Sequence, residues 1–171
     1  MLKNVRCNVE DYRVFHDGNR VEDVTKADLP QITKSTTSVK AAGMIMDVDF
    51  PNWYHFEAME MGLSHNNGNG CSRLTMPGPH NVELRVARQN YSVSQGDMDL
   101  ELVKVRARLI HKSTEKGSIE TNNPLGSNEK FSVLRYEEEI AGEIITLIDS
   151  TAGRLILDGV DYSDRMTSIL D

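Results

Sequence analysis

Histidines, cysteines and carboxylates are the side chains of this chain that could bind a metal ion or catalyse a reaction. The histidines are His16, His55, His65, His80 and His111. None pairs with another His, Cys or Glu at the short helical or hairpin spacing that zinc sites use. His65 and Cys71 flank an Asn- and Gly-rich loop, but they are two ligands without a third. The sequence therefore predicts no metal site and no bound cofactor.

Other motifs of catalysis and ligand binding are also missing from the sequence. Acidic residues alternate at Asp97, Asp99 and Glu101, but without the twelve-residue spacing and closing Glu of an EF-hand. There is no Gly-x-Ser-x-Gly elbow, and no Gly-rich loop followed by the Lys of a phosphate site. We therefore expect a protein that is not an enzyme. A small ligand-binding β-barrel or hydrolase is the alternative of another class, because a pair of catalytic carboxylates leaves no signature in sequence.

Charge and hydropathy exclude further classes. The 171 residues carry 19 Lys+Arg against 26 Asp+Glu, a formal net charge of −7. Coating of DNA or RNA needs clustered cations, so this balance argues against it, although nucleic acid could still slide past. The longest apolar stretch, residues 41–46, is far shorter than the ~20 residues that cross a bilayer. We expect no membrane partner, no secretory signal in the first seven residues, and two ordinary thiols in a reducing compartment.

Short alternating runs separated by turn residues favour one mainly β domain over residues 1–171. Apolar residues alternate with polar ones in 82–86 and in 103–109. The alternation changes phase between Leu102 and Val103, which suggests a β-bulge there. Residues 113–130 are polar and rich in turn residues, which predicts a mobile loop.

Two further expectations concern helix and charge. Residues 71–76 could form one or two helical turns, and the tail from Asp158 a short turn or helix. Three cations alternate along one strand face, and two carboxylates could neutralise them from the next strand. These residues are Lys104, Arg106 and Arg108, facing Glu137 and Glu139.

Residues 40–56 combine unusual apolar content with a Pro51-Asn52 break, and we expect a long hairpin that contacts neighbouring subunits. An exposed apolar patch of this size usually marks an interface, whereas the alternative is that these residues fill the core. The predicted interface residues are Lys40, Ala41, Ala42, Gly43, Met44, Ile45, Met46, Phe50, Trp53 and Tyr54.

Several motifs, each weak alone, occur together in an order that resembles the major tail tube proteins of contractile-tailed bacteriophages and R-type bacteriocins, which are distantly related to type VI secretion ring proteins. The resemblance runs from about Asn8 to Ile169. Its motifs are Leu29-Pro30 with Thr33, Ala41 to Met44, Phe56 to Glu60, Val105 to Lys112, Lys130 to Asp149, and Asp158 to Asp161. The chain departs from the family where a well-formed helix usually follows the second hairpin strand.

The resemblance implies a fold of two antiparallel sheets packed as a sandwich or small barrel, with a flanking short helix and a long protruding hairpin. It implies hexameric rings stacked into a hollow tube in the virion tail, assembled in the host cytoplasm. The implied partners are further copies of the chain, the tail sheath, terminator and baseplate or initiator proteins, and a tape measure protein in the lumen. DNA would pass without specific binding, and a type VI secretion or bacteriocin tube is the alternative.

An acidic lumen would repel phosphate and so keep DNA from adhering during ejection. The candidate lumen-lining residues are Asp47, Asp49, Asp97, Asp99 and Glu101.

Overall fold

A computed structural model of the chain describes residues 4–68 and 71–170. Asn69 and Gly70 of the predicted Asn- and Gly-rich loop lie outside the described residues. In chain order the elements are β1 (Asn4–His16), β2 (Asn19–Val21), β3 (Val24–Asp28), β4 (Lys34–Val39), β5 (Val48–Phe56), β6 (Glu60–His65), β7 (Pro79–Ser92), β8 (Asp97–Lys116), β9 (Ser127–Ile140), β10 (Glu143–Asp149), β11 (Arg154–Leu157), β12 (Val160–Asp161) and α1 (Ser163–Leu170).

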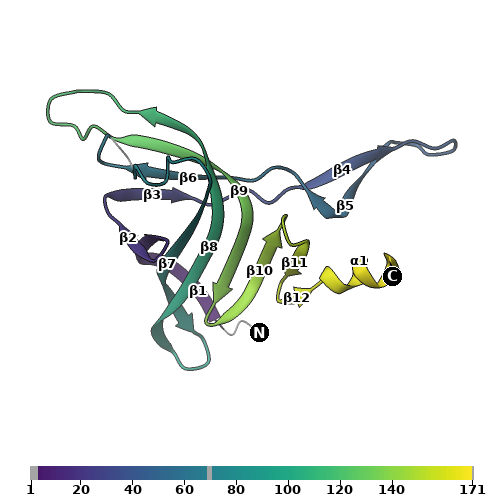
Figure 1. Cartoon of the computed structure of the whole chain (residues 1–171). Coiled ribbons are helices and arrows are strands. Elements are labelled where there is room, and N and C mark those ends of the chain that lie inside the picture. The colour runs from purple at the N-terminus through teal and green to yellow at the C-terminus, as the bar shows by residue number, and fades with distance from the viewer. Residues whose placement is uncertain (1–3, 69–70, 171) are drawn as a thin grey trace.

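The described strands form two antiparallel sheets and no closed barrel, which confirms the expected fold class. The large sheet has the strand order β12-β11-β10-β9-β8-β7-β1-β2. One edge of β9 pairs with β6 along its first half and with β10 along its second half. β6 in turn pairs with β3. The sheet therefore splits and curves, as Figure 1 shows.

The core lies where β3 and β6 fold over the middle of the large sheet. Strand alternation produces it: Val103, Val105, Ala107 and Leu109 share one face of β8 and are all buried. They pack in one cluster with side chains from neighbouring strands, among them Val82, Leu84, Met61, Leu63 and Phe131. The alternation predicted for 82–86 and 103–109 is thus confirmed as strand structure.

The suggested bulge at Leu102 and Val103 is wrong. β7 and β8 pair without a register shift from Ser92↔Asp97 to Pro79↔Ile110. The alternation changes phase because the surroundings of the strand change: β9 ends at Ile140, opposite Val103, and residues 97–102 extend past it. The alternation of polar and apolar residues reflects which side chains are buried. At Leu102 the burial of the strand changes, whereas its backbone pairing with β7 continues without a bulge.

The predicted helical turns at 71–76 are also wrong. Two reverse turns occupy this segment, with the Leu74 amide donating to the Cys71 carbonyl and the Met76 amide to the Arg73 carbonyl. Pro77 and Pro79 frame its end and prevent helix continuation. The expected flanking helix is instead α1 at the C-terminus. Among the described residues, no helix is long and apolar enough to span a membrane.

The polar segment 113–130 is shorter as a loop than we expected. β8 continues to Lys116 and β9 begins at Ser127, with Ser113 to Lys116 pairing with Ser127 to Lys130. Backbone pairing does not need apolar side chains, so polarity alone does not end a strand. Residues 117–126 connect the two strands, and their mobility stays a prediction.

Candidate assembly surfaces

The hairpin β4–β5 projects from the body of the protein (Figure 1). Its strands pair with each other and form a separate two-stranded sheet. At the tip, Gly43 has a φ of 94°, and the Met44 amide donates to the Ala41 carbonyl at 3.1 Å. Lys40 Nζ lies 3.0 Å from a carboxylate oxygen of Asp47, which joins the two sides of the tip. The predicted protruding hairpin is confirmed, and it starts at Lys34 rather than Lys40.

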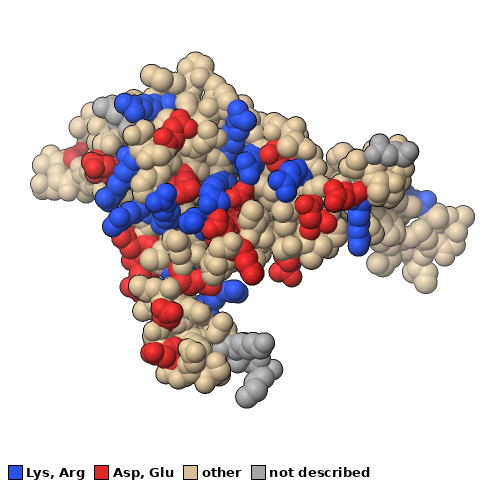
Figure 2. Space-filling model, turned by 60° about the horizontal axis from the view of Figure 1, so that its bottom comes forward, with Lys and Arg blue, Asp and Glu red and all other residues tan. Residues whose placement is uncertain are grey.

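Most of the predicted interface residues are exposed in the single chain. Ile45 is fully exposed, and Met46 and Trp53 are 71% and 69% exposed. Met44 and Phe50 are exposed as well. In Figure 2 the hairpin tip is an almost uniformly uncharged lobe at the right edge of the molecule. The idea that these five apolar residues fill the core is therefore wrong.

Tyr54 differs from its neighbours because it points toward the body of the protein. It is half-buried and packs against the core cluster. A shallow cavity of about 310 Å³ lies between the hairpin base and the C-terminal elements, lined by Lys34, Trp53 and Tyr54 on one side and by Leu155, Leu157, Tyr162 and Arg165 on the other. The hairpin thus has an anchored base and a free tip.

The end of the β7–β8 pair forms a second projecting surface, which sequence reasoning missed. Met98, Leu100 and Leu102 are 51%, 61% and 47% exposed and share one face of β8, because strand side chains alternate between faces. Tyr91 and Val93 are also exposed at this end. The signal was present in the strict alternation of residues 97–102, where each acidic residue is followed by an apolar one.

The five candidate lumen residues fall into two separate groups. Asp47 and Asp49 lie on the hairpin β4–β5, whereas Asp97, Asp99 and Glu101 lie at the β7–β8 end, on a different side of the molecule (Figure 1). Glu101 is not a free charge, because Arg88 Nη2 donates to it at 2.7 Å and Arg6 Nε lies 3.7 Å away. Asp97 and Asp99 are exposed, so the β7–β8 end presents acidic and apolar residues on opposite faces.

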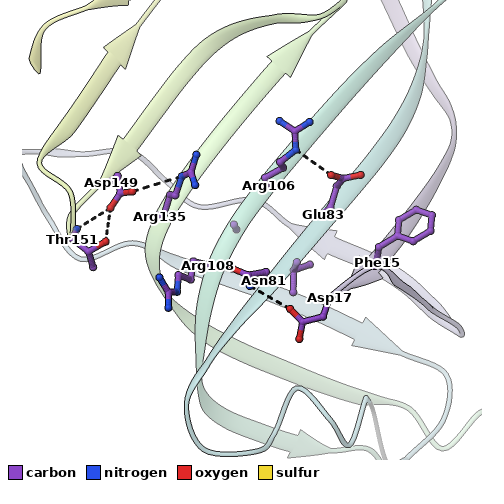
Figure 3. Close-up of a pocket in the computed structure, with 12 residues that line it drawn as sticks. Phe15, Asp17, Asn81, Glu83, Arg106, Arg108, Arg135, Asp149 and Thr151 are labelled. Carbon is purple, nitrogen blue, oxygen red and sulfur yellow. Dashed lines mark hydrogen bonds and ion pairs between the residues drawn. The ribbon is translucent and has the colours of Figure 1, made fainter.

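A network of ion pairs covers one face of the central strands, where Figure 2 shows basic and acidic side chains side by side and Figure 3 shows the contact of Arg106 with Glu83. Arg106 contacts Glu137 at 2.5 Å, Glu139 at 2.8 Å and Glu83 at 3.1 Å. Lys104 donates to Glu139 at 3.1 Å. The predicted neutralisation of the cationic stripe by Glu137 and Glu139 is confirmed for Lys104 and Arg106, whereas Arg108 lies opposite Arg135 and makes no ion pair with either carboxylate among the described residues.

The network shifts the pKa values of Arg106, Glu83 and Glu139. The hydrogen bond to Glu137 is the main reason that the pKa of Arg106 lies above its ordinary value. Burial raises the pKa of Glu83, but hydrogen bonds from Arg85 and Arg106 outweigh it, and the result is a lowered pKa. The hydrogen bond from Lys104 lowers the pKa of Glu139. All these groups are therefore charged at neutral pH.

The buried side chain of His65 faces the buried Glu129, with Nε2 3.5 Å from the carboxylate. Among the described residues, one group of metal-ligating side chains comes together: His16, Asp17 and His80 have ligand atoms within 4.8 Å of one another. Sequence spacing did not reveal this group, because strand pairing joins residues that are far apart in sequence.

Comparison with known proteins decides the family. A family model described as "Phage tail tube protein FII" matches residues 7–170, nearly the whole chain. The chain belongs to the phage tail tube protein FII family. No curated protein matches it in sequence. This membership gives the chain a structural role in a phage-type tail tube, as the resemblance predicted.

Solved structures of tail tube-like particles share the fold of this family member. A sheath/tube terminator of an extracellular contractile injection system, PVC, aligns with a TM-score of 0.57 at 10% identity, covering 78% of this chain and 96% of that one. A chain of the PVC sheath–tube complex aligns with a TM-score of 0.57 at 10% identity, covering 77% of this chain and 90% of that one. The tube-terminating cap of the anti-feeding prophage aligns with a TM-score of 0.57 at 12% identity, covering 79% of this chain and 93% of that one. At such identities the likeness concerns the fold.

Proposed function

We propose that this tail tube protein assembles as hexameric rings that stack into a hollow conduit. The observation that carries the proposal is the hairpin β4–β5, whose apolar tip has no partner within the described chain. Large exposed apolar side chains on a projecting arm are typical of an interface between copies. A contact between two different surfaces of the chain closes into a ring by rotation, and stacking then extends the assembly.

The hairpin tip is the surface that we assign to the contact with an adjacent subunit, and Lys40 to Met46, Phe50 and Trp53 supply it. Tyr54 acts from the base, where it holds the hairpin against the core. The two-stranded hairpin has free strand edges, and an added strand from a neighbour would satisfy them. Apolar burial and strand pairing would then both stabilise the ring.

Acidic side chains support a role as a conduit for DNA. The net charge is −7, and Asp97 and Asp99 are exposed at the β7–β8 end. A carboxylate-lined channel repels phosphate, so DNA would pass without specific binding. Asp47 and Asp49 lie on the other projection, and we assign the lumen to the β7–β8 group first.

The proposed partners are a tail sheath, a tail terminator, a baseplate or initiator protein, and a tape measure protein inside the tube. Similar folds occur in structures described as a sheath–tube complex and as a tube-terminating cap, which supports the first two. The assembled protein would reside in the virion tail, after assembly in the host cytoplasm.

A single charge at the hairpin tip tests the proposal. Ile45→Asp should leave the monomer folded, because the side chain is fully exposed and surface substitutions usually change stability by less than about 0.5 kcal/mol. It should abolish rings and tubes in negative-stain electron micrographs of concentrated protein. The matched control is Ile119→Asp, since Ile119 is 91% exposed but lies in the 117–126 connection. Tubes of Ile45→Asp as abundant as those of the control would contradict the proposed interface.

A further inference from the structure

Two histidines meet at the junction of β1 and β7. His16 ends β1 and His80 lies at the start of β7, and antiparallel pairing of these strands places His16 opposite Val82. Each histidine is only 8% exposed. His16 Nε2 lies 3.2 Å from His80 Nδ1, so two imidazole nitrogens face each other in a buried position.

Asp17 adds a carboxylate to this pair. It has a φ of 46° and is followed by Gly18 with a φ of 82°, the two positive values of a type I′ turn. This turn directs Asp17 Oδ2 to a position 3.1 Å from His16 Nε2. Asn81 fixes the residue twice: its side-chain amide donates to Oδ1 at 3.3 Å, a contact visible in Figure 3, and its carbonyl accepts from the Asp17 amide at 3.0 Å.

A backbone carbonyl sets the tautomer of His80. His80 Nε2 lies 2.8 Å from the Met76 carbonyl oxygen, which can only accept a hydrogen bond. Nε2 therefore carries the proton, and the lone pair of Nδ1 faces His16. A histidine whose far nitrogen donates to a carbonyl is the usual arrangement of a metal ligand with its outer-shell partner.

We propose that His16, Asp17 and His80 form a binding site for a transition-metal ion of the Zn²⁺ class. Zinc–nitrogen bonds of 2.0–2.1 Å in a tetrahedron separate neighbouring ligand atoms by about 3.3 Å. The two pairs that include His16 Nε2 lie at 3.1 and 3.2 Å, and all three ligand atoms fall within 4.8 Å of one another. Two of the three ligand pairs are thus already at the spacing of zinc ligands, and a small side-chain adjustment would complete the third.

The surroundings provide access for an ion and space for water as a fourth ligand. His16 borders a cavity of about 310 Å³, also lined by Asn19, Asn67 and Cys71, which can hold water. Asp17 is itself half exposed, so an ion can reach it from solvent. An ion at His16 Nε2 would replace the hydrogen bond to His80 Nδ1, and the neutral His16 ring would then carry its proton on Nδ1. The bound ion would join the β1–β2 turn to the start of β7.

Nearby charges act in both directions. The Arg73 guanidinium faces His16 and disfavours an added cation, whereas the Asp17 carboxylate favours it. Burial is the main reason that the pKa of His16 is lowered.

Metal titration of the full-length protein tests the site. The background carries Cys7→Ser, since Cys7 is an exposed thiol that could bind zinc by itself. Isothermal titration with ZnCl₂ should give one ion per chain. Zinc at about a hundredfold of its Kd should raise Tm by about 5–10 °C, and EDTA should reverse the rise. No heat of binding and no rise in Tm with zinc would overturn the proposal.

Three variants separate this site from others. Asp17→Asn keeps a residue that tolerates positive φ and removes the charged ligand, so zinc affinity should fall sharply while the apo protein stays folded. Asn81→Ala removes an outer-shell partner and should weaken binding by about 10–100-fold. His55→Gln changes an exposed histidine outside the cluster and should leave the titration unchanged. Equal zinc affinity in Asp17→Asn and His55→Gln would show that the ion binds elsewhere and would overturn the assignment.

Discussion

The two projections of this tail tube protein differ in how they are held. The hairpin β4–β5 is a sheet of two strands, attached through residues at its base such as Tyr54. The β7–β8 end is the continuation of two long strands whose other halves lie in the centre of the large sheet. Isolated two-stranded hairpins are marginally stable in water, whereas strands anchored in a wide sheet are rigid. The protein thus presents one adaptable arm and one preformed edge.

The projections also differ in chemistry. The tip of β4–β5 is mainly apolar, with Ile45 and Met46 exposed to solvent, and carries the single ion pair of Lys40 with Asp47. The β7–β8 end carries apolar and acidic side chains on opposite faces: Met98, Leu100 and Leu102 occupy one face, and the acidic residues occupy the other. In the proposed tube, the apolar arm would contact a neighbouring subunit, and the two-faced edge would lie between a subunit and the channel.

Hydrogen exchange should give the largest contrast between the two projections. In the unassembled protein, amides of β5 should exchange at least about 100-fold faster than amides of β8, because local opening of a two-stranded sheet costs several kcal/mol less than opening the large sheet. Mass spectrometry of peptic fragments measures this ratio. Assembly should slow exchange in β5 far more than in β8. Equal protection of the two hairpins before assembly would break the distinction between arm and edge.

A charge on the apolar face of the edge should have an intermediate effect. Burial of a leucine side chain stabilises by about 1.5–3 kcal/mol, so Leu100→Asp should raise the protein concentration needed for tube formation by about 10–100-fold. Sedimentation at a series of concentrations measures this threshold. Asp99→Asn, one residue away on the opposite face, is the control and should change the threshold by no more than about twofold. A similar change in both variants would mean that the two faces are not distinct.

A fall in pH should have the smallest of the three effects, and it should lower the stability of the large sheet that lies between the two projections. The pKa values of Glu83 and Glu139 are lower in the folded protein than their ordinary value of 4.5, so the unfolded chain binds more protons. Their contribution to stability is complete above about pH 4.5 and is lost as the pH falls through the lowered values. Tm should therefore decline by a few degrees below pH 4.5. Arg106→Gln should flatten this decline, whereas an unchanged pH profile would exclude the network as its source.

Sequence patterns predicted the fold where one face of a strand is buried along its whole length. The alternation in residues 82–86 and 103–109 gave strands, and the charge pattern of Arg106 with Glu137 and Glu139 gave correct neighbours. The apolar composition of 40–56 identified the projecting hairpin. Each of these patterns lies within one segment or joins two strands that follow each other in the chain, so it can be recognised in the sequence.

The errors arose where the pattern reflects something other than backbone shape. At Leu102 the phase change marks the end of β9 and not a bulge. In 71–76 the prolines limit the chain to turns, and in 113–130 strand pairing extends through polar residues. The cluster of His16 and His80 could not be predicted, because 64 residues separate the two and only the pairing of β1 with β7 brings them together.

The continuous pairing of β7 with β8 has a consequence for how the protein reaches its fold. A shift of one residue between two strands turns every side chain to the opposite face. In β8 such a slip would turn Val103 and Val105 toward water and Arg106 toward the core, while at the far end it would exchange acidic and apolar residues in the opposite sense. Such a shift is costly in the inner half of the strand, where Val103 and Val105 are buried. This half of β8 therefore favours the observed alignment over one-residue shifts.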